Sequence, residues 1–319
     1  KVDAAIIYGS AFFKQSGVET GEKKSYDVML LVSDPNAWHR QNYAINREDY
    51  SYLGRLFLIH NYLPKKVIKN PINQKISCIF KEQYNGNEIK FLIIETAMAL
   101  HSAYTWDYIS IPGRWHKEIK VVVNNLGESL DKALEFNRES AAKVSLIINS
   151  HDQISEEEFE ETIANISYMK DVRMTTGSED ADKVKNIRDG SKRFLQLHYV
   201  NLPFIKKEDR YILNTSKQIT TGELPTNMAQ YIWSTPEKTR GQVVREYLEK
   251  RTEQDSVSLA IRCFCTTGPK KAAQVFIGKK IKALKSKLYK GEHYHVAFGR
   301  KNDLGKKTEP KGIKQLVKK

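Results

Sequence analysis

Short apolar runs, ended by polar turns, dominate the first part of the chain and are typical of β-strands. Six runs of four to eight residues fit this pattern: 3–8, 26–33, 66–69, 75–81, 88–95 and 118–124. Asn85-Gly86 separates two of them and favours a hairpin. Apolar residues at helical spacing predict helices at 38–63 and 96–103. The first part of the chain is therefore expected to form a mixed α/β unit.

The pattern changes after residue 120 to apolar positions three and four residues apart, which is typical of helices. Helices are predicted at 129–149, 155–168, 187–200, 225–233, 236–251 and 257–265. Ser155 and Glu158 form the S-x-x-E pattern of a capping box at the start of one of them. A short hairpin is predicted at 211–221. The predicted fold class is α+β, with a nucleotidyltransferase-type mixed sheet domain at 1–120 and a mainly helical, winged-helix-like domain at 121–268.

The distribution of charge separates a third segment, residues 269–319, from the rest of the chain. The 319-residue chain carries a formal charge of +14, and residues 270–319 hold 16 of its 52 Lys and Arg but only three acidic residues. A nearly neutral body is therefore followed by a basic arm. The body contains no run near the ~18 apolar residues of a membrane-spanning helix. Three cysteines also make a disulfide framework improbable.

The residues that predict a chemical function lie in the turn after the first strand and at the start of the second. Gly9-Ser10 follows a buried strand, and Asp27 opens the next strand. Glycine permits close backbone approach to a phosphate, turn N–H groups bind phosphate oxygens, and a carboxylate on the neighbouring strand holds Mg²⁺. The generic pattern also has a second carboxylate two residues later, where this chain has Met29. These features are typical of a nucleotidyltransferase site.

Residues 8–17, Tyr-Gly-Ser-Ala-Phe-Phe-Lys-Gln-Ser-Gly, resemble the opening signature of the mitochondrial phosphatidate cytidylyltransferases, the translocator assembly and maintenance protein family. The resemblance extends over most of 4–190. Later positions in step with the family are Asp27–Val32, Asp34-Pro35, Trp38-His39, Asn42, Tyr50-Ser51, Leu53-Gly54, Asn70, Lys90, Trp106, Gly113-Arg114, Lys117, Ser155-Glu156-Glu157, Ser167-Tyr168, Asp171, Arg173-Met174 and Gly177.

The resemblance implies a Mg²⁺-dependent enzyme that converts CTP and phosphatidic acid into CDP-diacylglycerol and pyrophosphate for cardiolipin synthesis. It implies a peripheral protein on the matrix side of the inner mitochondrial membrane. The residues it assigns to catalysis are Asp27, Ser10 and Lys117, with Asp27 as the metal ligand. Those it assigns to the nucleotide are Gly9, Ser10, His39, Lys90 and Arg114. His39 also has a simpler interpretation, as a capping or core histidine.

Several positions depart from the family pattern. Ser102-Ala103 stands where the family has an Asp-Leu pair, Asp49 stands where it has a histidine, and the late Ser- and Gly-rich motif is eroded at 265–268 and 272–275. An alternative therefore stays open, in which the chain is a catalytically silent relative that serves as a structural or accessory subunit of a mitochondrial complex.

The basic arm has its own pattern. Ala273, Ile277, Ile281, Leu284 and Leu288 form one apolar stripe at helical spacing, flanked by lysines. This is typical of a helix that lies on an anionic membrane, where each basic group contributes ~1 kcal/mol. Nucleic acid is the less favoured electrostatic partner, because no nucleic-acid-binding motif accompanies the charge.

Overall fold

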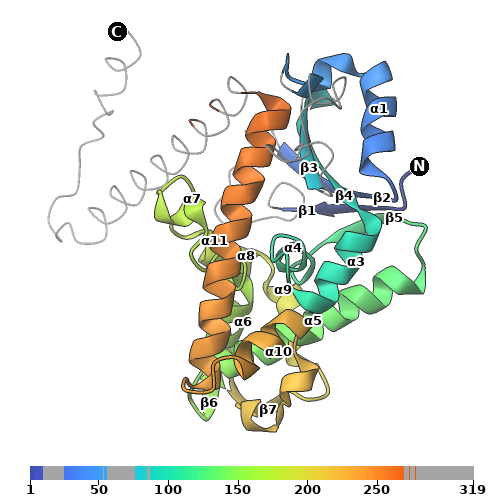
Figure 1. The fold of residues 1–319 in the computed structure, drawn as a ribbon. Coiled ribbons are helices and arrows are strands. Elements are labelled where there is room, and N and C mark those ends of the chain that lie inside the picture. The colour runs from blue at the N-terminus through green and yellow to red at the C-terminus, as the bar shows by residue number, and fades with distance from the viewer. Residues whose placement is uncertain are drawn as a thin grey trace, which may run out of the picture.

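The structure is a computed structural model that describes residues 1–9, 25–52, 54–55, 76–84 and 87–268, together with 273 and 277. It confirms the α+β class, with a larger sheet at one end of the molecule and a mainly helical unit at the other (Figure 1). The predicted strand at 66–69, the Asn85-Gly86 turn and nearly all of the basic arm lie outside the described residues.

The larger sheet has five strands in the order β3-β4-β2-β1-β5. Their bounds are β1 Ala4–Tyr8, β2 Ser25–Val32, β3 Ile76–Tyr84, β4 Asn87–Glu95 and β5 Lys120–Asn124. β2 and β4 are parallel, and the other neighbours are antiparallel. The predicted pairing of β3 with β4 is thereby confirmed.

Helices cover both faces of this sheet. On one face, Val32, Ile79 and Ile93 pack with Tyr50 and with aromatic residues of α1 (Pro35–Ile45). On the other face, Ile6, Met29, Leu31, Leu92 and Ile94 pack against α3 (Thr96–Thr105), α4 (Pro112–Trp115) and the first half of α5 (Glu128–Ile148). Strict alternation along β2 and β4 divides the two sets, as expected for a sheet buried on both faces.

The helical unit is built around the second half of α5. Its residues Ala141–Ile148 join a separate core with residues of α6, α10 and α11. The remaining elements are β6 Gln153–Ser155, α6 Glu156–Asn165, α7 Val172–Thr175, α8 Lys183–Gly190, α9 Lys192–Leu195, a π-helical turn Gln196–Val200, β7 Lys206–Glu208, β8 Tyr211–Leu213, 3₁₀ turns Ser216–Gln218 and Thr221–Glu223, α10 Thr226–Trp233 and α11 Arg240–Thr267. The capping box at Ser155 and Glu158 is present as predicted.

α11 connects the two ends of the molecule. It begins beside α10 in the helical unit and ends beside β3 of the larger sheet (Figure 1). Gly268 follows it with φ +83°, and a Cβ at that position would lie 2.8 Å from the Cβ of Ser51. A positive φ is typical of the residue that ends a helix, and the close approach to Ser51 requires glycine here.

Four predicted elements differ from the structure in the described residues. The helix expected over 38–63 ends at Ile45, and a 3₁₀ turn at Arg47–Asp49 follows. The hairpin expected at 211–221 is formed instead by β7 and β8. The helices expected at 236–251 and 257–265 are one continuous helix, α11. The domain limits at 120 and 268 stay predictions, since α5 contributes to both cores.

Candidate active site

One cross-strand row of side chains lies where β1 ends and where β2 and β4 begin. The register pairs Tyr8 with Asp27 across β1 and β2, and Asp27 with Lys90 across β2 and β4. The next row inward, centred on Met29, is buried. Because alternate strand residues share a face, the outer row lies on the same face, one step closer to solvent. All three of its side chains are partly buried.

Gly9 brings the backbone against this row. Its φ is +87°, and a Cβ built on it would lie 2.8 Å from Oδ2 of Asp27. A side chain at this position would therefore be strained by the backbone and would collide with the carboxylate. The glycine predicted to allow close approach to a phosphate lies directly beside the predicted metal ligand. Ser10, its predicted partner, lies outside the described residues.

Arg114 approaches the same row from α4. Its guanidinium carbon lies 5.4 Å from the centre of the Tyr8 ring, and its Nη1 donates to the carbonyl of Ser110. The turn that carries it packs tightly on the helical unit, since a Cβ on Gly113 would lie 2.4 Å from the Cβ of Ser167. Glycine at 113 thus lets α4 approach the helical unit closely enough to place Arg114 between the sheet and the helices.

Lys117 lies just beyond α4, on the helical side of Arg114. Its ammonium donates to the Ser167 hydroxyl and lies 4.4 Å from the centre of the Tyr168 ring. Burial lowers the pKa of Lys117 well below its usual value, and the nearby cations, led by Arg114, lower it further. Across the described part of the chain, no carboxylate lies within ion-pair distance of this ammonium. A phosphate group would supply the missing negative charge.

Two more cations face Lys117 from the helical unit. Arg173 binds Asp171 through its Nε, 3.0 and 3.2 Å from the two carboxylate oxygens, and through its Nη2. Burial acts to raise the pKa of Asp171, but hydrogen bonds and the charge of Arg173 outweigh it, so this pKa is lowered. Lys183, near the start of α8, also lowers the pKa of Lys117. Burial raises the pKa of Tyr168, whose ring lies beside the Lys117 ammonium, to about 12.

Sequence reasoning did not assign a site role to Tyr168, Asp171, Arg173 or Lys183. Tyr168, Asp171 and Arg173 match the family pattern, and this match was the only sign in the sequence of a role for them. Because they are distant from Lys117 along the chain, the sequence did not show that they lie near it. The Asp171 side chain also accepts from the backbone N–H of Arg173, 2.8 Å away. The pair is therefore held rigidly at the start of α7.

His39 is not brought together with this group. It lies in α1, on the opposite face of the sheet from Asp27. Its side chain is fully buried, with Nδ1 2.9 Å from the hydroxyl of Tyr50. Burial lowers the pKa of His39 to about 4, so the ring is neutral at physiological pH. These contacts fit the core interpretation. Lys90, by contrast, lies in the row and forms an ion pair with Glu88 at 3.3 Å.

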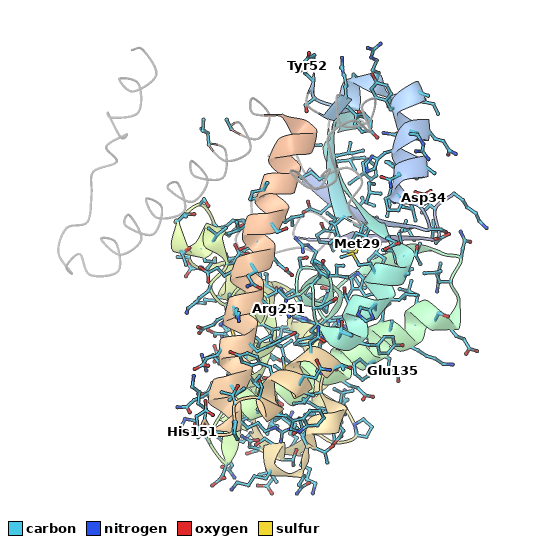
Figure 2. The ribbon with its side chains drawn as sticks, in the orientation of Figure 1. Met29, Asp34, Tyr52, Glu135, His151 and Arg251 are labelled. Atoms are coloured by element: carbon cyan, nitrogen blue, oxygen red, sulfur yellow. The ribbon has the colours of Figure 1, made fainter. Side chains whose placement is uncertain are left out.

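The donor set near Asp27 fits a magnesium ion that is shared with substrate. No group of three or more His, Cys, Asp or Glu side chains in the described ranges is placed to hold a metal by itself. Met29, at the position of the generic second carboxylate, is buried and its sulfur accepts from the Trp115 indole at 3.1 Å. Figure 2 labels Met29 where the sheet meets these helices. Mg²⁺ commonly binds through one or two carboxylates together with water and substrate phosphates, which is what a site with Asp27 alone would require.

Ser102, which departs from the family pattern, has a structural partner. It is fully buried in α3, and its hydroxyl donates to Oδ1 of Asp107 at 2.9 Å. The same oxygen accepts from the hydroxyl of Thr105 at 3.0 Å. The hydroxyl thus fastens the end of α3 to the residue after Trp106. The eroded late motif begins in the last turn of α11, and the rest of it lies almost wholly outside the described residues.

No helix in the described residues is both long and apolar enough to cross a membrane.

Comparison with known proteins gives a consistent result. The family model described as mitochondrial phosphatidate cytidylyltransferase matches residues 1–283. Curated relatives with that name include the protein of Danio rerio, which is 32% identical over 61% of this chain and 56% of its own length. The protein of Homo sapiens is 31% identical over 59% of this chain and 40% of its own length. The relative from Saccharomyces cerevisiae is 25% identical over 87% of this chain and 66% of its own length. The chain spans about half the length of the first curated relatives that it matches. On the match over most of its length, this chain belongs to the mitochondrial phosphatidate cytidylyltransferase family.

Proposed function

We propose that this chain transfers the cytidylyl group of CTP to phosphatidic acid, forming CDP-diacylglycerol and pyrophosphate. The observation that carries the proposal is the meeting of two groups of side chains between the sheet and the helical unit. Asp27 and the Gly9 backbone lie on the sheet, and Arg114 approaches them over the ring of Tyr8. Lys117 and Arg173 lie near Arg114, toward the helical unit. One carboxylate on the sheet and several cations on the helical side, of which Arg173 is paired with Asp171 and Glu179, suit a reaction between two phosphate-bearing substrates.

The chemical step is a displacement at phosphorus. An oxygen of the phosphatidate phosphate attacks the α-phosphorus of CTP and forms the new P–O bond of the diphosphate. The bond from the α-phosphorus to the bridging oxygen breaks, and pyrophosphate carries away the electron pair. The attacking oxygen is already ionised, so the step requires no strong base. Positioning and charge neutralisation are the protein's main contributions.

The charged residues divide between the two substrates. Gly9 and Arg114 lie nearest the sheet and are assigned to the triphosphate. Lys90, which pairs with Asp27 across β2 and β4, is assigned to it as well. Lys117 and Arg173 lie deeper toward the helical unit and are assigned to the phosphomonoester of phosphatidic acid. Arginine suits this task because its planar guanidinium can bind two phosphate oxygens at once. Lys117 would then lie between the two substrates.

Magnesium completes this assignment. Asp27 would hold Mg²⁺ together with oxygens of the triphosphate, and the ion would neutralise charge on the leaving pyrophosphate. Ser10 is proposed to add a hydroxyl donor next to Gly9. His39 is left out of the proposed nucleotide site, because it packs on the other face of the sheet.

The location of the protein is part of the proposal. The relatives are named mitochondrial, and we place this chain peripherally on the matrix side of the inner membrane. The basic arm at 270–319 is proposed to bind anionic lipid, which also supplies the acceptor substrate. Deleting the arm should weaken binding to cardiolipin-containing vesicles, with a deficit that shrinks as salt rises. Unchanged vesicle binding would exclude the arm as the attachment. Retention by a protein complex or by RNA in its place would favour those partners.

The reaction itself is tested with the purified chain, labelled CTP, Mg²⁺ and phosphatidic acid in detergent. Asp27→Asn keeps the size of the side chain and removes the charge. We expect turnover to fall at least ~100-fold, because metal-assisted charge stabilisation contributes several kcal/mol. Asp152→Asn is the matched control, since that carboxylate is 95% exposed at the far end of the helical unit. Folded wild-type protein that neither binds CTP nor forms product would instead favour the silent accessory subunit.

A further inference from the structure

Two adjacent residues of α11 reach the backbone of the two segments that carry the cations of the candidate site. Oδ2 of Asp255 accepts from the backbone N–H of Ser110 at 3.1 Å. The hydroxyl oxygen of Ser256 accepts from the backbone N–H of Val172 at 3.2 Å. These contacts join positions 145 and 84 residues apart in the sequence. One turn of α11 therefore touches both sides of the site.

The contact at Ser110 leads directly to Arg114. The N–H of Ser110 is held by Asp255, and the carbonyl of the same residue accepts from the Arg114 guanidinium. That guanidinium in turn lies over the ring of Tyr8, next to Gly9. If Ser110 shifts, the direction of the Arg114 side chain shifts with it. Asp255 thus anchors the segment that aims Arg114 at the sheet.

The contact at Val172 lies between the two members of the other ion pair. Val172 separates Asp171 from Arg173, whose side chains bind each other through two hydrogen bonds from Nε and one from Nη2. The hydroxyl of Ser256 donates its own proton to the carbonyl of Glu253 at 3.0 Å, which leaves a lone pair for Val172. Ser256 therefore has a fixed orientation and holds the first turn of α7 in place.

α11 does not depend on these two contacts for its place in the fold. Val243, Val244 and Leu248 are fully buried in it. Tyr247 donates to the carbonyl of Trp106 at 2.9 Å, and Glu249 forms an ion pair with Lys170 at 2.9 Å. Both Asp255 and Ser256 are only partly buried. Their removal should leave the helix docked and loosen only the segments they bind.

We propose that Asp255 and Ser256 are positioning residues for the two substrates. Asp255 sets Arg114, and through it the triphosphate side of the site. Ser256 sets Arg173, and through it the phosphatidate side. The inference rests on the proposed cytidylyl transfer, and it assigns separate halves of that reaction to two neighbouring side chains of one helix.

Steady-state kinetics of the full chain test this division. Asp255→Ala should raise the KM for CTP about fivefold and leave the KM for phosphatidic acid unchanged, and Ser256→Ala should do the reverse. Fivefold corresponds to ~1 kcal/mol, the contribution of one hydrogen bond. Asp255→Asn and Ser256→Thr keep an acceptor atom and should restore wild-type values. Gln254→Ala, on the exposed side of the same turn, is the control.

A purely structural role predicts a different result. Both alanine variants would then lower the melting temperature and change the KM values for CTP and phosphatidic acid alike. Asp255→Asn and Ser256→Thr would show no difference between the two substrates. That outcome, or wild-type kinetics in both alanine variants, overturns the inference while leaving the proposed function intact. A wild-type chain that forms no product overturns the proposed function and the inference with it, so the two failures are distinguishable.

Discussion

The substitution Gly9→Ala tests the closeness of the turn to Asp27. Two separate costs follow from the geometry. The φ of +87° is a conformation that costs a residue with a Cβ about 1–3 kcal/mol. The added Cβ would also lie 2.8 Å from Oδ2 of Asp27, whereas ordinary contact begins near 3.4 Å. The carboxylate must therefore move by roughly 0.6 Å, which it can do by rotating its side chain.

These two costs should appear in different measurements. The backbone term acts on stability and should lower the melting temperature by about 2–4 °C for each kcal/mol. The displaced carboxylate acts on turnover, because a misplacement near 1 Å costs ~100-fold. We expect Gly9→Ala to reduce kcat between ~10-fold and ~100-fold in a CDP-diacylglycerol assay with labelled CTP. Thermal unfolding of the same preparation gives the stability term.

Gly127→Ala separates the two effects. Gly127 also has a positive φ, +55°, but a Cβ there would meet nothing within 4 Å. This variant should lose stability to a similar extent and keep its kcat. The reasoning is refuted if Gly9→Ala turns over at the wild-type rate, or if Gly127→Ala loses as much activity at an equal loss of stability.

Three further predictions concern the cation cluster, formed by Arg114, Lys117, Arg173 and Lys183, and the packing of α4 beside it. Because the pKa of Lys117 is lowered, its ammonium loses its proton as the pH rises toward 10.5, so kcat/KM for phosphatidic acid should fall on the alkaline side. Lys117→Arg should move this decline to higher pH, because arginine keeps its charge. Activity that rises with pH would instead identify Lys117 as a base. Asp171→Asn removes a charge that raises the pKa of Lys117, so the decline should begin at lower pH, and an unchanged profile would argue against the cluster. Gly113→Ala places a Cβ 2.4 Å from that of Ser167 and should lower the free energy of unfolding in urea by about 1–3 kcal/mol. Adding Ser167→Gly to the same chain should recover most of this loss. A double variant that recovers nothing would contradict the close packing of these two positions.

The strands could be predicted because local pattern and tertiary burial agree there. Alternation along β2 and β4 separates the two buried faces, and the structure uses both. β7 could not be predicted in the same way. Its sequence Lys-Lys-Glu is exposed and has no apolar alternation, so pairing with β8 alone makes it a strand. The hairpin was therefore expected on the wrong side of Tyr211.

The break expected within α11 has a related cause. Residues 252–256, Thr-Glu-Gln-Asp-Ser, interrupt the apolar periodicity and resemble a polar loop. In the fold, Thr252 is buried, while Asp255 and Ser256 bind backbone groups of other segments. Polar residues that satisfy distant N–H groups cannot be distinguished from a linker by periodicity, because their partners are far away in the sequence. The continuity of α11 is a tertiary property.

The candidate site divides along the same line. The local pattern placed Gly9 and Asp27 at strand ends, and the family resemblance supplied Lys90; the register brings these strands side by side, and the roles of the three residues stay predictions. Arg173 could not be assigned a role, since its approach to Lys117 depends on the packing of α4 against the helical unit. Gly113 was the local signal of that approach, as a glycine where two segments come into contact.

Local charge, rather than the net charge of the chain, decides what the site can bind. The body before residue 270 is nearly neutral, because most of the positive excess lies in the arm. Yet burial, together with the nearby cations Arg114, Lys183 and Arg173, lowers the pKa of Lys117 inside that neutral body, so several positive charges gather around this ammonium. Concentrating cations in a partly buried site costs free energy in the unliganded protein. A bound phosphate recovers that cost, so the same arrangement that destabilises the empty site favours anionic substrates. The proposed reaction between two phosphate-bearing substrates needs such a site whatever the charge of the arm at 270–319.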